Sequence, residues 1–120
     1  MEENVNLSVS EEVIVTLAER VILAVPGVYS LYGGIMSGIN NMLGKKSSRG
    51  IKVDMNSNEI SMDVYIVVEY GVKIPDIAWE IQDKVKKELE NMTGMNVTTV
   101  NVHIQGINYE TKKDEGTKID

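Results

Sequence analysis

The sequence contains no cysteine and no phenylalanine among its 120 residues, and only two prolines and one histidine. The absence of cysteine excludes a disulfide framework, a thiol nucleophile and a zinc site built on cysteine. Without phenylalanine, the core must consist of aliphatic side chains, with the seven methionines filling irregular gaps. A single domain of this length buries enough apolar surface to fold without covalent cross-links.

Long hydrophobic runs are also missing. No apolar stretch approaches the roughly 20 residues that a membrane-spanning helix needs. The first residues, Met1 to Asn4, lack the basic and apolar regions of a secretory signal peptide. We therefore expect a cytoplasmic protein without a direct membrane span, which reaches a membrane only peripherally through a partner.

Basic residues are outnumbered, because 12 lysines and arginines face 18 aspartates and glutamates, for a net charge of −6. Nucleic acid and anionic lipid repel such a chain overall, so we expect no nucleic-acid partner. Nucleic-acid binding by a small α/β module remains an alternative that a basic surface would favour.

The clearest strand pattern begins at Ile60, from which the even positions are apolar as far as Tyr70. This alternation is typical of a strand with one buried face. Tyr65 and Val67 fall on the other parity, so the second face is partly apolar as well. A preceding strand at 51–55 can pair with it as a hairpin, with Met55 facing Ile60, Val53 facing Met62 and Ile51 facing Val64.

A helix is predicted from Pro75 to Met92, since proline suits the first helical turn and Gly94 can end a helix in the left-handed conformation. Its apolar residues recur at spacings of three and four and form a stripe for the core. That stripe consists of Ile77, Ala78, Ile81, Val85, Leu89 and Met92. A last strand follows at 95–104, where a bulge near Thr98 and Thr99 brings the apolar residues into one phase.

The first third of the chain predicts a short strand through Val5, Leu7 and Val9, a helix from Glu11 to Val25 capped by Ser10, and a strand from Val28 to Tyr32. The helix is expected to bury Val13, Ile14, Leu17, Ala18, Val21 and Ile22. The segment 33–50 reads as a short helix or a loop.

Together these elements predict an α+β fold in two layers: a mixed sheet with two main helices on one face, in the order β-α-β-(short helix or loop)-β-β-α-β. We expect one domain over residues 1–109. The nearly all-polar residues 110–120 are expected to form a disordered tail.

Catalytic chemistry is hard to find in this chain. The run from Gly44 to Ser47 invites comparison with a phosphate-binding loop, but its spacing fails and Lys46 stands where Ser or Thr should hold magnesium. His103 lies on the polar side of its strand, and we read it as an isolated surface histidine. We therefore predict no catalytic residues, no cofactor and no metal site, and a protein that is not an enzyme.

The residues with the best claim to function are candidates for a protein interface. Trp79 lies far around the helix from the apolar stripe, so either another layer covers it or it anchors a contact with another protein, as tryptophan often does. Tyr65 and Val67 are expected as its companions, together with Met36 and Ile39 of the central segment.

Several stretches, with the run Tyr-Gly-Val-Lys-Ile-Pro among them, resemble the alkaline shock protein family of bacterial envelope stress response proteins. They are Ala18 to Val28, Met62 to Pro75, Ala78 to Val85, Met92 to Gly94 and Val100 to Gly106. The resemblance implies a small α/β domain without known catalytic residues, in cytosolic proteins of Gram-positive bacteria linked to envelope stress. Some members self-associate and sit at the membrane through an integral partner.

From this resemblance we expect a non-enzymatic, self-associating scaffold in the cell-envelope stress response and in envelope homeostasis. Its partners would be other copies of itself and a small integral membrane protein. Other branches of the family are linked to acetyl-CoA carboxylase, so the alternative is a regulatory partner of lipid-synthesis enzymes.

Overall fold

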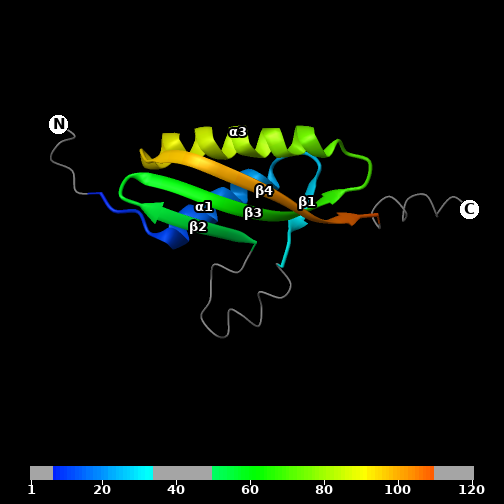
Figure 1. Cartoon of the computed structure of the whole chain (residues 1–120), viewed down its shortest axis with the longest axis horizontal. Coiled ribbons are helices and arrows are strands. Elements are labelled where there is room, and N and C mark those ends of the chain that lie inside the picture. Colours follow the sequence, from blue (N-terminus) through cyan, green and yellow to red (C-terminus); the bar gives the residue numbers. More distant parts are fainter. Residues whose placement is uncertain (1–6, 34–49, 110–120) are drawn as a thin grey trace, which may run out of the picture.

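The structure is a computed structural model that describes residues 7–33 and 50–109. In these ranges the chain forms, in order, α1 (Glu11–Leu23), β1 (Val28–Leu31), β2 (Ile51–Asn56), β3 (Glu59–Glu69), α3 (Ile74–Thr93) and β4 (Asn96–Asn108) (Figure 1). Only the even positions of β3 from Ile60 to Val68 are buried, so both helices pack on the same face of the sheet. This is the two-layer α+β fold that the sequence predicts.

The sheet is mixed, as predicted, and β3 is its central strand. β4 runs parallel to β3 along its whole length, while β2 and β1 are antiparallel to it. Because a strand has only two edges, β2 and β1 must share the edge opposite β4, one after the other. Tyr65 marks their junction: its N–H donates to the Gly50 carbonyl at 2.8 Å, and its carbonyl accepts from the Tyr32 N–H at 2.8 Å.

Two details of strand pairing that the sequence predicts are confirmed. In the hairpin of β2 and β3, Ile51, Val53 and Met55 lie opposite Val64, Met62 and Ile60. In β4 the register shifts where Ile60 pairs with Val97 but Ser61 pairs with Thr99, so Thr98 is the bulged residue. The bulge restores the alternation, and Val100 then reaches the core.

The predicted caps of the helices are confirmed, although α1 ends at Leu23 and not at the predicted Val25. The Ser10 hydroxyl caps α1 by accepting from the Val13 N–H at 3.2 Å. Pro75 lies in the first turn of α3, and Gly94 ends this helix with a φ of +79°, where its N–H donates to the Glu90 carbonyl at 2.9 Å.

Two residues predicted to be buried are not. Met92 is 50% exposed, because the buried stripe of α3 advances by four residues at each step and continues from Leu89 to Thr93 instead. The buried Thr93 hydroxyl is satisfied there, because it donates a hydrogen bond to the Leu89 carbonyl at 2.7 Å. Val13 is 46% exposed, since the core face of α1 is formed by Ile14, Val15, Ala18 and Ile22.

Some predictions are only partly testable. The expected first strand is wrong over residues 7–9, which have no strand structure, and its earlier residues lie outside the described part. Residues 34–49 of the predicted short helix or loop lie outside it as well, as does the predicted tail, residues 110–120.

Candidate interaction surface

One face of the sheet is left uncovered by every element that the structure describes. Since the even positions of β3 face the helices, its odd positions from Ser61 to Glu69 face the opposite side. The parallel register adds their neighbours on β4, so that Asp63 lies beside Asn101, Tyr65 beside His103 and Val67 beside Gly106. We call this uncovered side the open face.

A stacked pair of rings lies in the middle of the open face. The ring centroids of Tyr65 and His103 are 4.5 Å apart, and the ring planes differ by only 13°. The His103 Nε2 lies 2.9 Å from the Asp63 Oδ1, and the Asn101 side-chain amide donates to the same oxygen at 3.2 Å. Asp63, which is itself bonded by Asn101, therefore holds the imidazole flat against the tyrosine.

The hydrogen bond from His103 lowers the pKa of the Asp63 carboxyl below its ordinary value, and the bond from Asn101 and the charge of Lys52 act in the same direction. Partial burial of the carboxyl raises its pKa and so opposes this shift, but the hydrogen bond from His103 has the larger effect. The carboxylate therefore stays ionised and keeps the imidazole oriented, as a carboxylate commonly does for a histidine.

The expectation of an isolated histidine is therefore wrong, although His103 does lie on the polar side of its strand. Its partner Asp63 is 40 residues away in the sequence, and only the parallel pairing of β3 with β4 brings the two together. The signal that could have found this pair is the matched polar parity of Asp63, Asn101 and His103, once that pairing is assumed.

Trp79 lies on a different surface. Its side chain is 64% exposed, so nothing in the described part of the chain covers it. At 100° per residue it is 200° around α3 from both Ile77 and Ile81, which face the sheet. Tyr65 and Val67 instead lie on the open face, and the interface predicted for these three residues stays a prediction. Met36 and Ile39 lie outside the described residues.

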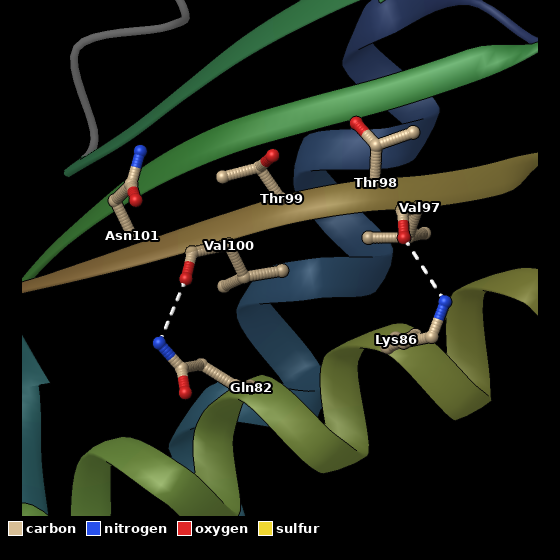
Figure 2. A pocket seen from close by; sticks show the side chains of 7 residues that line it. All are labelled: Gln82, Lys86, Val97, Thr98, Thr99, Val100 and Asn101. Atoms are coloured by element: carbon tan, nitrogen blue, oxygen red, sulfur yellow. Dashed lines mark hydrogen bonds between the residues drawn. The ribbon is translucent and has the colours of Figure 1, made fainter.

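A pocket of about 320 Å³ lies between α3 and the first half of β4. It is lined by Gln82, Lys86 and the strand residues Val97 to Asn101. Figure 2 shows Gln82 and Lys86 reaching from the helix to the strand, where they donate to the carbonyls of Val100 at 3.0 Å and Val97 at 3.1 Å. These two bonds hold the helix and the strand together.

Two further features are absent from the described residues. These residues contain no group of three or more histidine, cysteine, aspartate or glutamate side chains placed to hold a metal ion. They also contain no helix that is both long enough and apolar enough to cross a membrane.

Comparison with solved structures shows what the fold resembles. A manganese form of a MamM CTD variant superposes with a TM-score of 0.51 over 81% of this chain and 99% of that one, at 14% sequence identity. A second MamM CTD variant gives a TM-score of 0.50 at 15% identity, over 79% and 95% of the two chains. At such low identity the likeness concerns the fold alone.

Comparison of sequences is more specific. The chain is 36% identical to the uncharacterized protein YqhY of Bacillus subtilis, over 91% of this chain and 82% of that protein. It is 27% identical to a stress response regulator gls24 homolog of Streptococcus pyogenes, over 89% of this chain and 60% of that protein. Residues 1–109 match the alkaline shock protein 23 family, which is described as having a cell envelope-related function. The chain therefore belongs to the alkaline shock protein 23 family, as its sequence motifs had indicated.

Proposed function

We propose that this protein is a non-enzymatic, self-associating scaffold of the cell-envelope stress response, which acts through contacts with other proteins. The family has a cell envelope-related function, and stress response regulators are among the relatives of this chain. Self-association and scaffolding are supported by the residues that lie on the surface of the chain.

The observation that carries the proposal is the position of the aromatic residues. The chain has five tyrosines and one tryptophan, and none of them belongs to the buried core, which is entirely aliphatic. Tyr29, Tyr32, Tyr70, Trp79 and Tyr109 are each about half exposed or more. Tyrosine and tryptophan are the residues that protein interfaces favour, because they bury a large area at little entropic cost.

The arrangement of these residues suits a scaffold in particular. Tyr65 lies on the open face of the sheet, whereas Trp79 lies on the outer side of α3. Two separate surfaces allow one chain to contact another copy of itself and a different protein at the same time. We propose that a small integral membrane protein is that second partner, and that it holds this otherwise cytoplasmic chain at the membrane.

The alternative, a regulatory partner of lipid-synthesis enzymes, would use the same surfaces on a different target. Affinity purification of the tagged protein from its native cells separates the two proposals. Recovery of a small membrane protein together with untagged copies of the chain supports the scaffold. Recovery of acetyl-CoA carboxylase subunits without them favours regulation.

The scaffold proposal also makes a prediction in cells. Deletion or overproduction should change survival under alkaline or cell-wall stress, since the number of complexes that a scaffold assembles depends on how much of it the cell contains. The proposal would be contradicted if the deletion strain and the overproducing strain both survived as well as the parent strain.

Nucleic acid is a poor match for the open face. Lys52, on β2, is outnumbered there by Asp54, Asp63 and Glu69. Phosphates would be repelled, so we expect no retardation of labelled DNA or RNA in a gel shift at low salt, where electrostatic binding is strongest. A shift under those conditions would revive nucleic-acid binding.

A further inference from the structure

β4 is an edge strand whose first half is capped by α3. Among the residues that the structure describes, only β3 pairs with β4, which leaves the other edge of β4 without a strand. Glu90 accepts from the Val97 N–H at 2.9 Å, and Lys86 donates to the Val97 carbonyl at 3.1 Å. Gln82 donates to the Val100 carbonyl at 3.0 Å. Side chains four residues apart thus act in place of a neighbouring strand.

The series of caps stops at Ala78. This residue lies one turn before Gln82 on the same side of α3, where a side chain of one carbon cannot reach a carbonyl. The N–H and C=O groups of successive residues point alternately to the two sides of a strand. Those of Val102 and Ile104 therefore point to the same side as the Val100 carbonyl, away from β3. No bond to either residue comes from that side in the described part of the chain. Figure 1 shows β4 diverging from α3 here.

The open half of this edge also lacks the usual protection against pairing. Edge strands normally carry lysine, other charges or proline. From Asn96 to Asn108 the strand contains no charged residue and no proline. The opposite edge differs, because β2 carries Lys52 and Asp54 and the edge is divided between two strands.

This neutrality points to a second copy of the chain as the occupant. With a net charge of −6, two copies repel each other overall. The electrostatic repulsion between them is therefore smallest where neither copy presents a charge. The open half of this uncharged strand, where no hydrogen bond from the described residues reaches the outward backbone groups of Val102 and Ile104, is such a place. It is also self-complementary, because antiparallel pairing joins each free N–H to a free carbonyl under two-fold symmetry.

We propose that two copies pair edge to edge through the open half of β4, antiparallel about a two-fold axis at His103. Val102 of one copy then exchanges both backbone hydrogen bonds with Ile104 of the other, and the symmetry repeats the exchange. The two sheets become one continuous sheet with a shared open face, on which the stacked rings of both copies lie side by side. This interface rests on the proposed self-association and specifies where it occurs.

Residue-resolved hydrogen exchange tests the interface on the unaltered protein. At concentrations where about nine molecules in ten are dimeric, the amides of Val102 and Ile104 should exchange about tenfold more slowly than in the monomer, because exchange then proceeds from the remaining monomer. The Asn101 and His103 amides are the internal control, since they point towards β3 in both states. Protection of Val102 and Ile104 that does not depend on concentration would overturn the interface.

A single cysteine provides a second test, because the chain has none of its own. In the proposed pairing the two copies of residue 103 form a non-hydrogen-bonded pair with Cα atoms about 4.5 Å apart, within the range of about 4.4–6.8 Å for a disulfide. The variant His103→Cys should therefore cross-link to a dimer under mild oxidation with copper phenanthroline. Asn101→Cys, on the same strand but off the axis, and Trp79→Cys should not.

The outcomes separate the interface from the proposed function. Selective cross-linking through residue 103 supports both. Suppose that the unaltered protein is a dimer by mass. If only the Trp79→Cys variant then cross-links, or if the exchange of the Val102 and Ile104 amides does not change, the edge interface is wrong and self-association stands. If its mass stays at 13.3 kDa at every concentration, both fail.

Discussion

At the scale of single residues, the open face is organised around Asp63, whose carboxylate receives bonds from both His103 and Asn101. Because its folded-state pKa is lowered below 3.8, the ionised carboxylate contributes stability above that pH, and the contribution is lost as the pH falls through the lowered pKa. The group is 39% exposed, so the effect is a small one.

The variant Asp63→Asn isolates this effect, since asparagine keeps the shape but cannot ionise. We expect wild type to be more stable than the variant at pH 5, with a difference that shrinks as the pH is lowered below 3.8. Thermal unfolding of both proteins, followed by circular dichroism from pH 5 to pH 3, measures the difference. A gap that stays constant or widens would show that the carboxylate charge is not what stabilises this cluster.

A second residue-scale prediction concerns Gly50, at the start of β2. Its φ is +93°, and a Cβ there would lie 2.7 Å from the Tyr32 carbonyl oxygen. Gly94 also has a positive φ, +79°, but has no atom near such a Cβ. Gly94→Ala should cost about 1–2 kcal/mol of unfolding free energy from backbone strain alone.

Gly50→Ala should cost about 1–3 kcal/mol more than Gly94→Ala, because it adds a steric clash with the backbone carbonyl of Tyr32, a residue whose N–H donates to the Tyr65 carbonyl. Urea unfolding of the two variants and wild type measures this comparison. Equal losses would mean that the junction of β1 and β2 is not as tight as described.

At the scale of elements, α3 combines two functions on different sides. Its buried stripe of Ile77, Ile81, Val85 and Leu89 holds it on the sheet, while Gln82 and Lys86 cap the edge of β4. Ile81 is fully buried and Trp79, two residues earlier, is 64% exposed. The two residues therefore offer a matched pair of truncations within one helix.

We expect Ile81→Ala to lower the free energy of unfolding by about 2–5 kcal/mol, because it leaves a cavity against the sheet. Trp79→Ala should change it by no more than about 0.5 kcal/mol, since a side chain directed to solvent loses few contacts. Chemical denaturation gives both values. A large loss from Trp79→Ala would mean that the tryptophan supports the fold and is not free to contact a partner.

Most of the individual elements could be predicted from the sequence, because their signals are local. The Ser10 cap and the Gly94 terminus depend on residues within one turn. The hairpin register of β2 and β3 follows from two short alternating runs joined by a tight turn. The bulge at Thr98 follows from a break in one such run.

The candidate site was less predictable, because it depends on a pairing between distant strands. Nothing in the local pattern around His103 indicates Asp63 or Tyr65, and a shift in the register of β4 would have selected other neighbours. Trp79 shows another limit. Helical geometry placed it away from the apolar stripe, but it could not decide whether another layer covers the side chain.

At the scale of the whole molecule, the buried core contains no aromatic residue, whereas five of the six aromatic side chains are about half exposed or more. A domain that used its aromatics for stability would bury them, since each offers a large apolar area. Their exposure, together with an uncharged and half-capped edge strand, is what we expect of a protein that works by contact.

Sedimentation equilibrium over a wide range of protein concentration tests this central claim most directly. The account predicts a mass that rises from 13.3 kDa at high dilution towards twice that value, with no change in the secondary structure. A mass of 13.3 kDa at every concentration, at neutral pH and moderate salt, would contradict it.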